Sequence, residues 1–227
     1  SKNVDFSETA LGEVWRLSSK SRLAAFPFDW EYSCPKGAVY PIRAAGVKVA
    51  TVEQELERVL RHRLPEPVHQ LKVKLRPEDI TSTEASFRYT HGLPLHEGLC
   101  QRLFHGHRSK VEVYVSKQRR ADLEHFICRE VFGESVHIAS ENQLVNGPVE
   151  LYQRGENATP IQLKYQSATG TFTGIVPHSR LFVVRGETSV ECITRALAEI
   201  VQKKEPNGES IRVVCYEGIG KGAICEL

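Results

Sequence analysis

Two stretches of the chain carry apolar residues at helical spacing. The first covers residues 51–64, where Thr51 and Gln54 form the pattern of a capping box. The second follows Thr188 and Glu191, which form the same pattern. The apolar positions that share one face of each segment are Val52, Leu56, Val59, Leu60 and Leu64, and Val190, Ile193, Leu197, Ile200 and Val201. The sequence therefore predicts two amphipathic helices.

Alternating apolar and polar residues predict strands on both sides of each helix. After the first helix, residues 68–75 alternate and are expected to pair with residues 87–90 as a hairpin. After the second helix, residues 211–215 alternate in the same way, and residues 222–227 supply the returning strand. The strand pairs expected upstream of the two helices are 14–17 with 23–26, and 161–165 with 171–176.

This order of elements recurs at an offset of about 140 residues. The recurrence predicts an α+β fold of two similar tandem units, each with antiparallel sheets and helices packed on one face. Residues 1–84 form the first unit, which is degenerate and lacks a metal motif, and residues 85–227 form the second. The alternative is a chance match between short helices and hairpins.

Composition narrows the classes of protein and of partner. The 227 residues are 41% hydrophobic and 26% charged, which is typical of a globular protein with a sizeable core. The net charge of +2 is too balanced to indicate nucleic acid or an anionic membrane as the main partner. RNA binding through the basic residues 117–120 is the weakest alternative. The absence of an apolar run of about 20 residues predicts no membrane span, and we expect a cytoplasmic protein with reduced cysteines.

Four of the nine histidines fall between positions 91 and 107. His105 and His107 precede an alternating run of valines, so both side chains are expected on one face of a strand. His91 ends the preceding strand, and a hairpin connection would bring its imidazole close to the other two. Three neutral imidazoles leave one tetrahedral position open, which is how catalytic zinc is held. The alternative is a pair of surface histidines that bind nothing.

Cys100 lies in the loop between these histidines, outside the periodic apolar positions. A thiol beside a divalent cation and Arg102 would have its thiolate form stabilised, which suits a base that removes a proton. The alternative is a buried and inert thiol.

Three short motifs, which follow one another between residues 91 and 107, resemble those of a known protein family. HGLP at 91–94, CQRL at 100–103 and HGH at 105–107 resemble the family of 6-pyruvoyl-tetrahydropterin synthase and 6-carboxytetrahydropterin synthase, which have the tunnelling fold. The resemblance covers residues 85–227 and implies that His91, His105 and His107 hold Zn²⁺ and that Cys100 is the catalytic base. RVVCYE at 212–217 resembles the late strand of the family, which implies that Glu217 binds the pterin ring.

The sequence departs from the family pattern before its last helix. Family members place an Asp-His pair there, as a relay to the catalytic cysteine, and the second half of this chain contains no such pair. His178, which follows Pro177 near the expected place, is predicted to keep the catalytic histidine role without its aspartate. The alternative is that His178 is a turn residue.

The resemblance implies a lyase that acts on 7,8-dihydroneopterin triphosphate and releases triphosphate. The spacing of CQRL before HGH is closer to the carboxytetrahydropterin branch, which also releases acetaldehyde and supplies queuosine precursors. Family assembly implies a homo-oligomer, and a tandem chain would form a trimer that imitates a hexamer. A catalytically weakened zinc protein that binds a pterin or purine is the second hypothesis, favoured by the missing aspartate.

Overall fold

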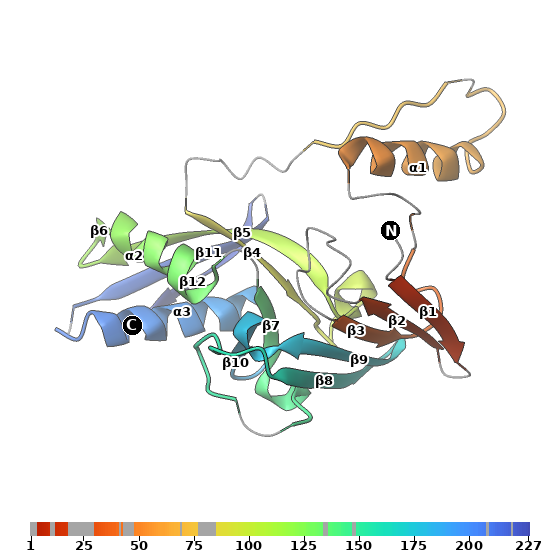
Figure 1. Cartoon of the computed structure of the whole chain (residues 1–227). Helices are drawn as coiled ribbons and strands as arrows, with labels where there is room; N and C mark the ends of the chain where they lie inside the picture. Colours follow the sequence, from red (N-terminus) through yellow and green to blue (C-terminus); the bar gives the residue numbers. More distant parts are fainter. Residues whose placement is uncertain are drawn as a thin grey trace.

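The computed structural model describes residues 4–9, 12–17, 30–40, 42, 48–68, 70–76, 85–133, 136–146, 149–207, 209–218 and 220–227. Its strands form two sheets, and its two longest helices are α1 (Val49–Arg61) and α3 (Val190–Lys204). Figure 1 shows α3 lying along one sheet and α1 standing apart from both. The chain is therefore of mixed α+β class, as predicted.

The larger sheet contains an antiparallel part in the spatial order β4-β5-β11-β12. Its strands are β4 (Ser86–His91), β5 (His105–Val115), β11 (Ile211–Gly218) and β12 (Lys221–Glu226), and the short β6 (Gln118–Arg119) also pairs with β5. Alternation along β5 buries Val111, Val113 and Val115 on one face, as the period of a strand requires.

Two helical segments cover that face of the sheet. The first is α2 (Ala121–Phe126), which continues into a turn of π-helix, η2 (Ile127–Val131), and the second is α3. Buried side chains of both segments join the strand valines in one core, including Leu123, Ile127, Ile193 and Leu197. The prediction that helices pack on one face of an antiparallel sheet is confirmed here.

Two further strands extend the larger sheet in parallel. These are β7 (Val136–Ser140), which pairs with β4, and β10 (Leu181–Val184), which pairs with β7. The prediction of antiparallel sheets is wrong at these strands, because both pairings are parallel. All five residues of β7 and all four of β10 are buried, so neither strand shows the alternation that would have revealed it.

The second sheet has the order β1-β2-β3-β9-β8 and joins distant parts of the chain. Its strands are β1 (Val4–Thr9), β2 (Gly12–Leu17), β3 (Trp30–Cys34), β8 (Pro160–Ser167) and β9 (Gly170–Pro177). Tyr32 of β3 shares a core with Leu163 and Phe172 of the β8–β9 hairpin. Because strands from before and after residue 84 build one sheet and one core, the tandem arrangement is not confirmed, and the division at residue 84 stays a prediction.

The segment around α1 differs most from the prediction. The helix begins at Val49 rather than Thr51, so the expected capping box at Thr51 is wrong, and it contributes no buried residue. Residues 70–76 belong to no strand, so the predicted hairpin with residues 87–90 is also wrong. Instead, the backbone N–H groups of Val73 and Leu75 donate hydrogen bonds of 2.9 and 2.8 Å to Glu57 and Glu53 of α1. Helix carboxylates therefore satisfy the groups that a sheet would have paired.

Near the C-terminus the predicted elements are present. The hairpins β8–β9 and β11–β12 contain the expected strands, and α3 begins at Val190 after the N-cap residue Ser189. Thr188 is not the cap, since its hydroxyl donates to the carbonyl oxygen of Gly92 at 3.1 Å. The predicted strand 14–17 lies in β2, and residues 23–26 lie outside the described part of the chain. Within the described residues, no helix has the length and apolar character needed to span a bilayer.

Candidate active site

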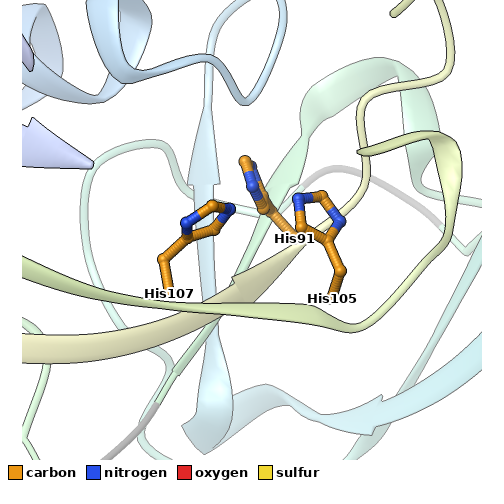
Figure 2. Close-up of side chains that lie close together, drawn as sticks. All are labelled: His91, His105 and His107. Carbon is orange, nitrogen blue, oxygen red and sulfur yellow. The ribbon is translucent and has the colours of Figure 1, made fainter. Parts of the chain in front are cut away.

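Three histidines meet at one end of the helix-covered face of the larger sheet. His105 and His107 lie on the same face of β5 as its buried valines, and His91 is the cross-strand partner of His105. One ring nitrogen from each of the three lies within 4.8 Å of the others. Figure 2 shows the three rings gathered around a common centre. The structure thus brings together the three residues that the sequence singled out.

Backbone carbonyl groups orient two of these rings. Nδ1 of His91 lies 2.7 Å from the carbonyl oxygen of Thr188, and Nδ1 of His105 lies 2.9 Å from that of Arg102. Because a carbonyl oxygen can only accept, each Nδ1 carries the proton and each Nε2 keeps its lone pair. The Nε2 atoms of His91, His105 and His107 are buried and form no hydrogen bond.

Burial also favours the neutral form of His91 and His105. It lowers the pKa of His91 to about 2, with a smaller contribution from the neighbouring His105, and it lowers the pKa of His105 from its ordinary value. Neutral imidazole is the form that binds a metal ion. The three buried Nε2 atoms without hydrogen-bond partners therefore fit a metal ion such as Zn²⁺, and the three-nitrogen set leaves a coordination position open.

Glu217 lies beside this cluster on the neighbouring strand. It shares one face of β11 with Ile211, Val213 and Cys215, and its side chain is only 6% exposed. Its Oε1 lies 3.7 Å from Nε2 of His107, while its Oε2 lies 2.5 Å from Nζ of Lys221. The carboxylate therefore bridges the histidine cluster and an ammonium group at the surface.

Cys100 lies in the short helical turn η1 (Gly98–Gln101), between β4 and β5. Its carbonyl oxygen accepts a hydrogen bond of 2.9 Å from the N–H of Leu93, which folds the loop back on itself. The ion pair with Glu217 is the main cause of the raised pKa of Lys221, and a smaller electrostatic interaction with Cys100 adds to it. Cys100 thus interacts electrostatically with Lys221, the residue that pairs with Glu217.

The second sheet holds this loop in place. Tyr165 of β8 donates a hydrogen bond of 2.5 Å from its hydroxyl to the carbonyl oxygen of Gln101. Gly92 packs so closely on Tyr165 that a Cβ there would lie 2.2 Å from the tyrosine oxygen. Gln143, in the short turn η3 (Glu141–Gln143), donates to the carbonyl oxygen of Gly92 at 3.0 Å. The close approach of Tyr165 therefore requires glycine at position 92.

His178 lies in the short turn η4 (His178–Arg180) after β9. Its ring packs directly on Gly155, where a Cβ would come within 2.2 Å of ring carbons. Among the described residues, no hydrogen bond or ion pair joins the side chain of His178 to Cys100 or to the three clustered histidines. The catalytic role of His178 stays a prediction.

Two residues next to the cluster were missed by the sequence analysis. His137 of β7 is 4% exposed, its Nδ1 lies 2.9 Å from the hydroxyl of Thr90, and its Nε2 has no partner. Burial lowers the pKa of His137 to about 3. Lys221 was missed because its place opposite Glu217 depends on the turn between β11 and β12. No pattern in the sequence marks either residue.

The three-histidine cluster, whose Nε2 atoms are buried at the end of an antiparallel sheet covered by helices, makes this an α+β protein with a site that could hold a metal ion. The chain belongs to the 6-pyruvoyl tetrahydropterin synthase family, whose model matches residues 80–227. This is a family of lyases of pterin metabolism, and its members are oligomeric. No curated protein matches the chain.

Two of the solved structures that are similar to this chain come from Plasmodium species. The 6-pyruvoyltetrahydropterin synthase of Plasmodium vivax is 13% identical, with a TM-score of 0.43. The synthase of Plasmodium falciparum is 17% identical, with a TM-score of 0.42. In both comparisons, 63% of this chain covers 91% of the other.

Proposed function

We propose that this protein is a zinc-dependent lyase that acts on 7,8-dihydroneopterin triphosphate, most like a 6-carboxytetrahydropterin synthase of the queuosine precursor pathway or a 6-pyruvoyl-tetrahydropterin synthase. The observation that carries the proposal is the buried cluster of His91, His105 and His107, with three unpartnered Nε2 atoms on a chain of this family. The proposal includes a cytoplasmic location.

The zinc ion, when bound, supplies a Lewis acid that makes the hydroxyl groups of the substrate side chain more acidic. Glu217 is proposed to hold the ring, because a carboxylate can accept paired hydrogen bonds from a ring N–H and the neighbouring amino group. The Cys100 thiolate is proposed to remove a proton from the side-chain carbon next to such a hydroxyl and so to become a thiol. The electron pair left on that carbon moves along the side chain of the substrate, and the C–O bond to the triphosphate breaks, so that triphosphate leaves with the electrons of that bond.

Replacement of Cys100 by alanine tests the proposed base. We expect turnover of 7,8-dihydroneopterin triphosphate to fall by roughly 100- to 10,000-fold, the usual contribution of a general base, while the zinc content stays unchanged. Product formation by chromatography and metal analysis on the same sample measure both quantities. Cys192→Ala, which changes a partly buried thiol of α3, is the matched control. Full turnover by Cys100→Ala would show that the base is another group.

A catalytically weakened pterin- or purine-binding zinc protein is the second proposal. The observation that favours it is the position of His178, whose side chain packs on Gly155 rather than on Cys100. Ligand binding that is equal in the wild type and in Cys100→Ala, without turnover by either protein, supports the binding protein. Turnover by the wild type excludes it.

We further propose that the chain assembles as a homo-oligomer, with a trimer as the expected form. Large apolar side chains are exposed on the site loop and on α1, among them Leu95 at 80%, Leu99 at 66% and Val49 at 60%. Contact with further copies would remove such side chains from water. Light scattering at micromolar concentration is expected to give about three times the mass of the chain. A monomer under these conditions would contradict this proposal.

A further inference from the structure

We propose that Lys221 is a specificity-determining residue, whose ammonium group donates a hydrogen bond to the ring carbonyl oxygen of a bound pterin while Glu217 accepts from the adjacent ring N–H and amino groups. The inference rests on the proposed function, because it assigns a contact with the substrate class named there. It adds a residue from β12 to a site otherwise built from β4, β5, β11 and the loop of Cys100.

The turn between β11 and β12 places Lys221 next to Glu217. Tyr216 pairs with Gly222 and Gly218 pairs with Lys221, so the two strands shift register by one residue at Glu217. Such a bulge puts two residues of one strand opposite a single residue of the other. Lys221 is therefore the cross-strand neighbour of Glu217. Gly222 brings the strands close, since a Cβ there would lie 2.6 Å from the carbonyl oxygen of Cys215.

The two side chains of this pair differ in exposure. The carboxylate of Glu217 is 6% exposed, whereas the side chain of Lys221 is 69% exposed. The inner carboxylate oxygen, Oε1, faces His107 at 3.7 Å, and the outer one, Oε2, faces the Lys221 ammonium at 2.5 Å. A flat ring that hydrogen-bonds to Oε2 would therefore lie next to the ammonium.

Neighbouring side chains favour the charged form of Lys221. After Glu217, the charges of Cys100 and Glu191 also raise the pKa of Lys221. The ammonium thus pairs with Glu217 of β11 and interacts electrostatically with groups of η1 and α3, and it is charged at neutral pH. A charged donor at the rim of a largely buried site is suited to pair with an uncharged acceptor on a ligand.

The edge of a pterin ring fits this pair of side chains. A carbonyl oxygen, a ring N–H and an amino group follow one another along that edge, so one acceptor stands beside two donors. A carboxylate accepts from the two donors and leaves the acceptor unsatisfied. An ammonium group has three donors, so Lys221 can keep its bond to Glu217 and donate another to the carbonyl oxygen. Leaving that oxygen buried without a donor would weaken binding.

Binding of neopterin, a pterin without phosphate groups, tests this assignment. Ligand fluorescence is expected to show binding to the zinc-loaded wild type, weakened roughly 10- to 100-fold in Lys221→Met and less in Lys221→Arg, which keeps a charged donor. Because neopterin carries no phosphate, the loss cannot come from a contact with phosphate. Lys203→Met, which removes a lysine from the exposed last turn of α3, is the matched control and is expected to bind like the wild type.

Infrared difference spectroscopy with neopterin labelled at the ring carbonyl separates a direct contact from an effect through Glu217. Donation from Lys221 lowers the carbonyl stretching frequency in the bound wild type, and the Lys221→Met complex is expected to lose most of that shift. Weaker binding with an unchanged carbonyl band would overturn the inference and leave the proposed function standing. Absence of neopterin binding by the wild type would overturn both, and it is detected before any variant is compared.

Discussion

Replacement of His105 by alanine is expected to remove the bound zinc and the turnover of 7,8-dihydroneopterin triphosphate together. His105 supplies one of the three buried Nε2 atoms that have no other partner, and its ring orientation is set by the carbonyl oxygen of Arg102. Loss of a direct ligand should reduce metal affinity by more than the 10- to 100-fold that loss of an outer hydrogen-bond partner costs. Zinc content per chain and product formation, measured on the same preparation, test the expectation.

His96→Ala is the matched control for this experiment. His96 lies in the same loop region, is about half exposed, and its Nε2 is 3.9 Å from Glu187 rather than close to the cluster. This variant is expected to keep its zinc. Full zinc occupancy in His105→Ala would contradict the assignment of the metal ligands. Zinc in the wild type without any turnover would instead favour the binding protein.

The second large expected effect is a steep loss of stability of the metal-free protein below about pH 6.5, the ordinary pKa of histidine. Burial lowers the pKa of His91 to about 2 and that of His137 to about 3. The unfolded chain therefore binds protons at these residues at a pH where the folded chain does not, so the free energy of unfolding falls as the pH falls. Above pH 6.5 both states are neutral at these residues and the effect vanishes.

The size of this effect follows from the two buried histidines. Each contributes about 1.4 kcal/mol per pH unit below its unfolded pKa, so the pair contributes about 4 kcal/mol between pH 7.5 and pH 5. This is a large part of the 5–15 kcal/mol that usually separates folded and unfolded states. Urea unfolding of chelator-treated protein at the two pH values measures the difference.

A histidine variant separates this cause from a general effect of acid. His137→Asn is expected to reduce the difference in unfolding free energy between the two pH values by about 2 kcal/mol, because the contribution of one buried imidazole is gone. His125→Asn, which changes an exposed residue of α2, should leave the difference unchanged. An equal pH dependence in the wild type and in His137→Asn would mean that other groups cause the acid sensitivity.

The local pattern of the chain was sufficient to predict much of the antiparallel sheet and of the metal-binding cluster. The valines of β5 alternate with polar residues, and a period of two places His105 and His107 on the same face whatever the rest of the fold does. A hairpin connection then brings His91 opposite His105. The helical stripe of α3 was recognised for the same reason, because its face is buried on a single core.

Longer-range pairing was beyond the reach of these patterns. Residues 70–76 alternate like a strand, yet glutamates of α1 take up two of their backbone N–H groups, and β4 pairs with β5 and β7 instead. The apolar face of α1 correctly predicted a helix. It did not show whether that face would be buried, and α1 contributes no buried residue. Periodicity specifies which side chains share one face of a helix or strand. It does not specify which other segment pairs with that strand or packs on that face, because this depends on the rest of the fold.

By itself, the sequence determined the α+β class, the family resemblance and the three histidines, since each depends on residue type and short spacing. Only the tertiary structure decided that β3 joins the β8–β9 hairpin, that His137 is buried beside the cluster, and that Lys221 faces Glu217. These contacts join residues whose neighbours depend on a bulge, on parallel strands without alternation, or on a sheet built from both ends of the chain. Such arrangements are stabilised by packing contacts between segments that are distant in the sequence, and these contacts cannot be read from any local stretch of the chain.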